Sequence, residues 1–289
     1  MNIEVIASTK VGYKMPKEEA ISFSGKAAGI CYMPDNFETL MNEPKDKTEK
    51  RANRTLKSGH HSVYGHSTYN LVLEGIPKIL AMILNNEQDY NTSEKSARYT
   101  HMEASPQEKD LYEKWIEIYE KRISEVYPDM FTEREINKKA MENARYLISV
   151  FTPATTMLYS VDFRQLNYIV NWAKDYINND MSDSFSLKLK DVFKDFIKAM
   201  PDVVVDELNA SQKGRKFSIF ADRERYEEFG ENYSTNYLAS FAELAQAQRH
   251  RTIEYEMSLL DNPQYFVPPI IKDTKLEEEI VIDNTNKIA

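Results

Sequence analysis

Apolar residues recur every three or four positions in several long segments, a spacing typical of amphipathic helices. Within residues 107–127 the spacing makes one apolar stripe, which is interrupted by Arg122. In the segment 183–199, the residues expected to face inward are Phe185, Leu187, Leu189, Val192, Phe193 and Phe196. The pattern predicts helices over residues 17–32, 47–58, 77–86, 107–127, 132–149, 162–177 and 183–199. Helix is therefore expected to dominate residues 105–200.

Local signals mark the ends of these helices. Pro16 and Pro77 stand where a first helical turn tolerates proline. Gly59 follows a lysine-rich last turn, which is the position of a left-handed cap. Thr132 and Glu135 have the spacing of a capping box.

Side chains that alternate between two faces, with a period of two residues, indicate strands. In residues 67–74, Tyr69, Leu71 and Leu73 alternate with neighbours of the opposite face. A shorter alternation over residues 3–7 predicts an opening strand. The expected fold class is α+β, with a mostly antiparallel sheet flanked by long helices.

The sequence pattern changes after Pro201, which suggests a domain boundary near residues 200–215. A polar stretch at 209–216 precedes a strand-like run at 216–221 and an acidic, helix-like run at 222–229. The acidic tail 274–289 has a weak pattern and is expected to be loosely packed.

Composition limits the possible functions. The net charge of -9 makes the chain repel polyanions, so a general nucleic-acid binder is not expected. The single cysteine, Cys31, allows neither an intrachain disulfide nor a thiolate zinc site, and its apolar surroundings predict a packed core thiol. No run of eighteen apolar residues and no basic leader followed by an apolar run is present, so no membrane association and a cytoplasmic location are expected.

Three clusters could carry chemistry. His60, His61 and His66 lie close together, but no acid or cysteine nearby completes a metal site, so a structural turn is favoured and no metal is expected. The strip 93–99 contains an arginine that could bind phosphate, although such strips are often solvated loops. The run 245–252 places two arginines around a histidine, which suggests either an anionic partner or a basic helix end.

Together these clusters resemble the flavin-dependent thymidylate synthases. The hallmark of that family is Arg-His-Arg, a spacer and Glu-x-Ser-x-Arg-Tyr, and residues 94–99 look like its second half. Further similar stretches, in family order, are residues 27–32, 57–66, 143–145 with 152–153, and 162–166. The resemblance covers residues 1–200.

The chain departs from the family pattern at two places. Asn86, Glu87 and Gln88 stand where the Arg-His-Arg tripeptide is expected, and Ala173 and Lys174 stand near the position of a later family arginine. The tripeptide reappears at 249–251, followed by an aromatic-Val-Pro exit, but without a good Glu-x-Ser-x-Arg. We interpret residues 201–289 as a partial second copy that complements the family-like domain 1–200.

The resemblance implies flavin-dependent methylation of dUMP, or of a related pyrimidine nucleotide, to dTMP at a composite site. FAD would be the cofactor, with methylenetetrahydrofolate and NADPH as co-substrates, and the chain would form a homo-oligomer, a tetramer or a dimer. The implied catalytic residues are Ser96, Arg98 and Lys174, and the implied nucleotide-binding residues are Glu94, Ser96, Ala97, Arg98 and Arg145. The implied flavin-facing residues are His60, Ser62, Glu94, Asp162, Arg164, Arg249, His250 and Arg251. The alternative is a catalytically impaired relative that serves as a nucleotide-binding, flavin-binding or scaffold protein.

Overall fold

The structure is a computed structural model of the 289-residue chain. It describes residues 12–87, 89–96, 99–209, 217–220, 237–250, 255, 257 and 265–288. The predicted opening strand and the helix-like run at 222–229 lie outside these residues.

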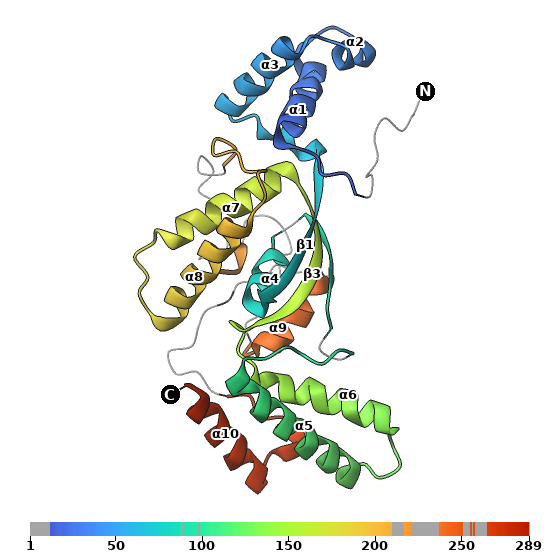
Figure 1. Cartoon of the computed structure of the whole chain (residues 1–289), viewed down its shortest axis with the longest axis vertical. Helices are drawn as coiled ribbons and strands as arrows, with labels where there is room; N and C mark the ends of the chain where they lie inside the picture. Colours follow the sequence, from blue (N-terminus) through green and yellow to red (C-terminus); the bar gives the residue numbers. More distant parts are fainter. Residues whose placement is uncertain are drawn as a thin grey trace. The chain divides into compact units, whose positions relative to one another are not determined.

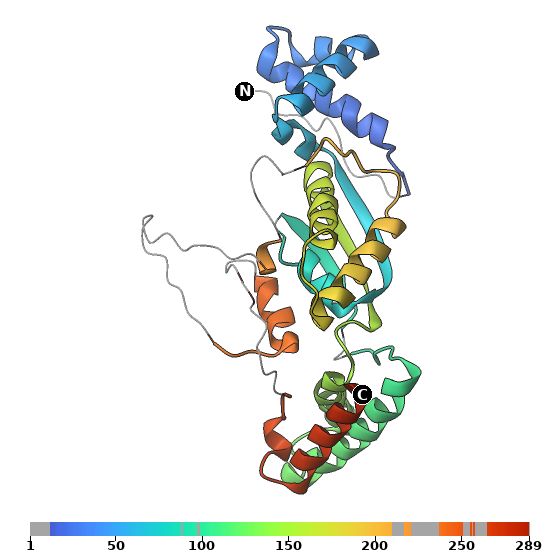
Figure 2. The ribbon, with the colours of Figure 1, turned by 90° about the vertical axis from the view of Figure 1, so that its left-hand side faces the viewer.

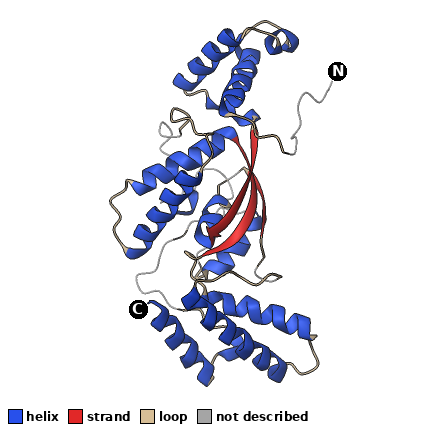
Figure 3. Cartoon of the chain, viewed as in Figure 1, coloured by secondary structure: helices blue, strands red, loops and turns tan. Residues whose placement is uncertain are grey.

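The described residues have the expected α+β fold, which combines many helices with one small sheet (Figure 3). The sheet is antiparallel with strand order β1-β3-β2, and its strands are β1 (Thr68–Pro77), β2 (Tyr90–Glu94) and β3 (Pro153–Asp162). The strand predicted over 67–74 is confirmed as β1. The central strand β3 interrupts the region expected to be helical, because Met157, Tyr159 and Val161 are buried at alternate positions.

Residue contacts divide the chain into two compact units. The first comprises residues 1–71, 87–92 and 158–217, and the second comprises 72–86, 93–157 and 218–289. Neither unit is continuous in sequence. The division into residues 1–200 and a partial second copy stays a prediction.

The helices of the first unit are α1 (Lys17–Tyr32), α2 (Phe37–Met41), α3 (Lys45–Lys57), α7 (Phe163–Ile177) and α8 (Ser184–Ala199), with the 3-10 helix η1 (His61–His66). α1 packs closely on α3, since a Cβ atom at Gly25 would lie 2.4 Å from the carbonyl oxygen of Thr48. Figure 2 shows α7 and α8 side by side. The ring of Phe217 stacks on that of Phe193 from α8 at 5.0 Å and meets that of Trp172 from α7 edge-on at 5.9 Å.

The helices of the second unit are α4 (Lys78–Leu84), α5 (Pro106–Val126), α6 (Glu133–Ala144), α9 (Phe241–Ala247) and α10 (Lys275–Ile288). Its 3-10 helices are η2 (Arg145–Leu147), η4 (Ser218–Phe220), η5 (Gln248–His250) and η6 (Pro269–Ile271). Helices α5, α6 and α10 lie together in Figure 1 and share one apolar core around Trp115 and Tyr119.

The local end signals are confirmed. Pro16 and Pro77 directly precede α1 and α4, and Gly59 has a φ of 74° after the end of α3. Thr132 and Glu135 form the predicted capping box. α6 ends at Ala144, where η2 continues the chain, so the predicted helix to residue 149 was too long.

Three other expectations were wrong. Residues 218–220 of the strand-like run form a 3-10 helix, Cys31 is exposed, and Leu187 of α8 is 49% exposed. Cys31 follows Gly29, the last buried position of α1, and lies in the exposed end of that helix. On α8 the buried face runs through Leu189, Phe193 and Phe196, and Leu187 falls outside it.

The acidic tail is packed, contrary to expectation. It forms α10, whose Ile280 is fully buried in the core of the second unit. Asp283 accepts hydrogen bonds from the indole N–H of Trp115 and from Lys114 Nζ, both at 2.8 Å. The acidic side chains of α10 thus fix this helix on α5.

Glu108 connects the start of α5 to the segment before β3. Its carboxylate closes the capping box with Ser105 and accepts the backbone N–H of Ser149 at 2.7 Å and the hydroxyl of Thr152. Burial alone would raise the pKa of Glu108, but the hydrogen bonds from Ser149, Ser105 and Thr152 outweigh it and lower the pKa to about 2.

This depressed pKa predicts a pH dependence of stability. Because the folded-state pKa lies below the ordinary value of 4.5, the contribution of Glu108 is complete above that value and is lost as the pH falls toward about 2. The thermal midpoint of Glu108→Gln should lie below that of the wild type at pH 7, and the difference should shrink between pH 4.5 and 2. A difference independent of pH would contradict this role. Glu117→Gln, on the same helix, is the control.

Candidate functional site

A polar cluster in the second unit surrounds Glu94, whose side chain is fully buried at the end of β2. Lys78 Nζ lies 2.5 Å from one carboxylate oxygen, and the Thr155 hydroxyl donates to the same oxygen at 3.2 Å. The Arg249 guanidinium donates to the other oxygen at 3.0 Å. One carboxylate therefore joins residues from β2, β3, α4 and η5.

Local structure explains why these groups meet. β2 pairs with β3, and the pairing continues past Glu94 through the Lys95 N–H, which donates to the Thr156 carbonyl at 2.9 Å. Lys78 is the first residue of α4, a helix whose other six residues are all buried. The Ile79 N–H, at the same helix start, donates to the Val150 carbonyl at 2.9 Å. The buried helix thus anchors the base of the lysine side chain at the end of the sheet.

The cluster carries an excess of positive charge. Burial lowers the pKa of Lys78, the charge of Glu94 opposes this shift, and the nearby charges of Arg249 and Arg145 lower the pKa further. Three cations thus act around one carboxylate. Such a site attracts an anion, and guanidinium groups match the oxygens of a phosphate.

Arg145 is well placed to bind a ligand. Its side chain is 15% exposed, and its nearest carboxylate, that of Glu142, is 3.9 Å away. Among the described residues, its Nε atom has no hydrogen-bond partner. An anion at this position would supply the missing acceptor.

The rest of the predicted nucleotide strip is described in part. Ser96 begins a turn in which its carbonyl oxygen accepts the N–H and hydroxyl of Thr100. Ala97 and Arg98, both predicted to bind the nucleotide, lie outside the described residues. From the second tripeptide, the side chain of Arg249 is described, whereas the side chain of His250 and all of Arg251 lie outside the described part.

The first unit contains the remaining predicted flavin-facing residues. Asp162 caps α7 by accepting the Gln165 N–H at 2.7 Å, and Arg164 lies 3.9 Å from its carboxylate. Burial raises the pKa of Asp162. A Cβ atom at Gly65 would lie 3.7 Å from that carboxylate, so η1 lies directly against Asp162.

The histidines of this turn have different surroundings. His60 Nδ1 is 2.6 Å from the Tyr32 hydroxyl, whereas His61 is buried, with Nδ1 2.9 Å from the Tyr168 hydroxyl. Ser62 and His66 are exposed. Within the ranges that the structure describes, no group of three His, Cys, Asp or Glu side chains converges as a metal site.

Lys174, predicted as catalytic, is also in the first unit. Its Nζ atom lies 2.7 Å from Asp206 Oδ1, and Ala173 beside it is fully buried. The lysine is thus engaged by a carboxylate in this structure.

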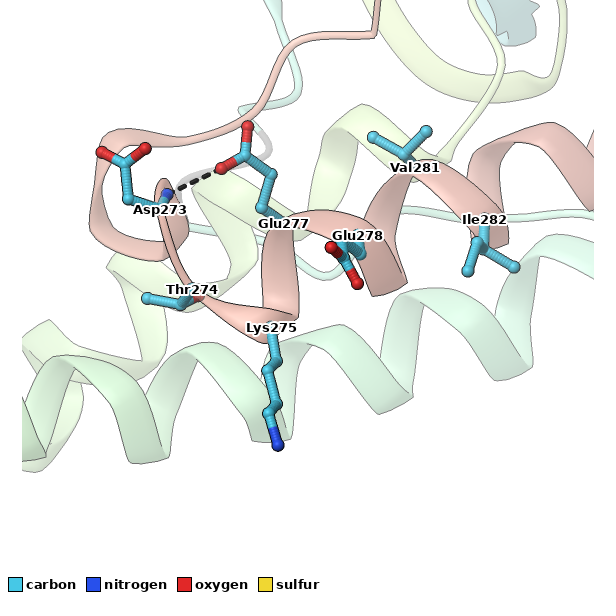
Figure 4. Close-up of a pocket in the computed structure, with 7 residues that line it drawn as sticks. All are labelled: Asp273, Thr274, Lys275, Glu277, Glu278, Val281 and Ile282. Atoms are coloured by element: carbon cyan, nitrogen blue, oxygen red, sulfur yellow. Dashed lines mark hydrogen bonds between the residues drawn. The ribbon is translucent and has the colours of Figure 1, made fainter.

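The surface hollow in Figure 4 is not this site. It has a volume of about 700 Å³ and is lined by Asp273, Thr274, Lys275, Glu277, Glu278, Val281 and Ile282. Glu277 accepts the Asp273 N–H at 2.6 Å. Three carboxylates against one lysine disfavour an anionic ligand here.

The sequence prediction did not include Lys78 or Thr155. A signal for Lys78 was present, since it is the one charged residue between Pro77 and an apolar run whose helix had to be buried. No comparable signal marks Thr155, because its role arises from the pairing of β3 with β2.

Among the described residues, no helix combines the length and apolar character needed to span a bilayer. The chain matches no curated protein. Two similar solved structures are a UMP/dUMP methylase PolB from Streptomyces cacaoi bound with 5-Br dUMP and a flavin-dependent thymidylate synthase ThyX from Helicobacter pylori complexed with FAD and dUMP.

The methylase is 13% identical, with a TM-score of 0.42, and the match covers 65% of this chain and 88% of the methylase. The synthase is 18% identical, with a TM-score of 0.36, and the match covers 63% of this chain and 90% of the synthase. At these TM-scores the family assignment rests on the family model alone. That model, Thy1, described as "Thymidylate synthase complementing protein", matches residues 14–175, more than half of the chain. The chain therefore belongs to the thymidylate synthase complementing protein family.

Proposed function

We propose that this protein binds FAD and a uridine nucleotide and methylates dUMP, or a related pyrimidine nucleotide, at a composite site. The observation that carries the proposal is the contact of Arg249 with Glu94, at 3.0 Å. Glu94 belongs to the strip 94–99, which resembles the second half of the family hallmark, and Arg249 begins the tripeptide that the first copy lacks. This contact supports a site in which the two parts complement each other within one chain.

The nucleotide phosphate fits the cationic side of this cluster. Arg145 retains a donor without a partner in the described part of the chain, and Lys78 is only 25% exposed. Low exposure strengthens the attraction of a cation for phosphate. Together with Ser96 and Arg98, these groups would hold dUMP in a fixed orientation.

The first unit offers a fit for the flavin. Arg164 lies 3.9 Å from its nearest carboxylate, and its Nε atom has no hydrogen-bond partner in the described ranges. The Nε donor is therefore available to a phosphate of FAD, and the resemblance adds Ser62 and His60 to the flavin-facing residues of this unit. When bound, reduced FAD would supply a hydride, while methylenetetrahydrofolate would supply the carbon and NADPH the reducing equivalents.

A second function has one observation in its favour. Lys174 stands near the place of a family arginine and is paired with Asp206 at 2.7 Å. A lysine engaged in this way is a weaker partner for a developing negative charge on the pyrimidine. This favours a protein that binds flavin and nucleotide without turnover.

The absorption spectrum of the purified protein tests the proposal. We expect the bands of bound oxidised flavin, either directly or after titration with FAD, and a shift of these bands when dUMP is added. Methyl transfer to dUMP would then be assayed with methylenetetrahydrofolate and NADPH. Bound flavin without product would support the second function, and no flavin binding at any concentration would overturn both.

A further inference from the structure

Asn86 ties together two segments that lie on either side of Arg249 in the sequence. Its Nδ2 atom donates to the Ser218 hydroxyl at 2.8 Å and to the Tyr255 carbonyl at 3.3 Å. The Ser218 hydroxyl donates back to the Asn86 carbonyl at 3.1 Å. The side chain and backbone of one residue thus hold both segments.

A backbone hydrogen bond closes the same junction. The Met257 N–H donates to the Ile219 carbonyl at 2.8 Å. Ser218 is 7% exposed and Ile219 is fully buried, so the junction is part of the interior of the second unit. Breaking buried hydrogen bonds is costly, because the separated donors and acceptors are left without partners.

The junction bears directly on Arg249. The chain between the two tied segments contains α9 and η5, and Arg249 in η5 contacts Glu94. Gln248, its neighbour, is 2% exposed. Because Tyr255, held by Asn86, lies only six residues after Arg249, the bond restricts how far the arginine can move, and less entropy is lost when it binds a ligand.

We propose that Asn86 is a positioning residue that holds the segment carrying Arg249 against Glu94. This inference rests on the proposed function. Asn86 stands where the first arginine of the family tripeptide is expected. At this position the chain therefore has an anchor for Arg249 in place of a ligand-binding arginine. The short amide supplies a donor that aspartate lacks and avoids the bulk of a guanidinium.

The first test measures hydrogen exchange of the full chain by mass spectrometry. In Asn86→Ala, the amides of residues 241–247 and of Met257 should exchange about tenfold faster, while those of α5 and α6 stay unchanged. Asn86→Asp should behave alike, because it keeps the size but loses the donor. Asn137→Ala, which removes the bond of another asparagine to Glu120 in the same unit, is the control. Unchanged protection in both Asn86 variants would overturn the proposal.

The second test is a double-mutant cycle on FAD affinity. Asn86→Ala should weaken FAD binding about tenfold in the wild-type background and have no further effect in Arg249→Ala. A purely structural role would give the same loss in both backgrounds and would overturn the proposal. If the wild type binds no FAD, the proposed function fails, and the exchange measurement still decides whether Asn86 holds the segment.

Discussion

Arg249→Ala is expected to weaken FAD binding about 100-fold, because the resemblance makes Arg249 a flavin-facing residue and the variant loses its charge-assisted contact with the cofactor. Folding should be preserved. Glu94 keeps its ion pair with Lys78 at 2.5 Å, and the Arg249 side chain is 44% exposed. The thermal midpoint should therefore stay within about 2 °C of the wild type. The measurement is a titration with FAD followed by flavin absorption.

Two variants complete this experiment. Arg134→Ala removes an exposed arginine from α6 and should leave FAD affinity unchanged. Arg249→Lys keeps the charge without the planar fork and should show an intermediate loss. If FAD affinity were the same in Arg249→Ala and the wild type, the composite site would be wrong.

Trp115→Ala is expected to have the largest effect on stability, lowering the free energy of unfolding by about 3–5 kcal/mol. Trp115 is fully buried at the centre of the α5, α6 and α10 core, where its ring contacts that of Tyr119 at 5.5 Å. The truncation would leave a large cavity and would also remove the donor to Asp283. Chemical denaturation followed by circular dichroism measures the change.

Val126→Ala provides the control for this variant, since Val126 is at the end of the same helix and is 38% exposed. Its effect should be below about 0.5 kcal/mol. Trp115→Phe separates the two contributions, because it retains most of the buried ring but removes the hydrogen bond to Asp283. A small loss for Trp115→Ala would mean that α10 and the core around it contribute little to folding.

Burial was harder to predict than helix position. The tail 274–289 was expected to be loose because of its acidic composition, yet its carboxylates are partners of Lys114 and Trp115 on α5. Cys31 and Leu187 show the opposite error, since Cys31 lies in an apolar run and Leu187 in an amphipathic helix, yet both are exposed. A hydrophobicity pattern says which residues can be buried, whereas a partner surface decides which ones are.

The site was predicted in parts. Glu94 and Arg249 were each named from the family hallmark, but 155 positions separate them in the sequence. Lys78 and Asn86 carry no motif of their own. Lys78 has its role because the buried helix α4 begins with it at the sheet. Asn86 has its role because distant segments of the chain meet at its side chain.

The sequence by itself determined those helix ends that carry a local capping signal, and it indicated the family. Caps such as Thr132 with Glu135 and the turn at Gly59 depend on interactions within a few residues, so local chemistry is sufficient to specify them. Only the tertiary structure decided that Arg249 meets Glu94 and Lys78, that Asn86 holds Ser218 and Tyr255, and that α10 is packed. These contacts join residues far apart in the chain, and their geometry depends on the cooperative packing of the whole unit, which no local pattern encodes.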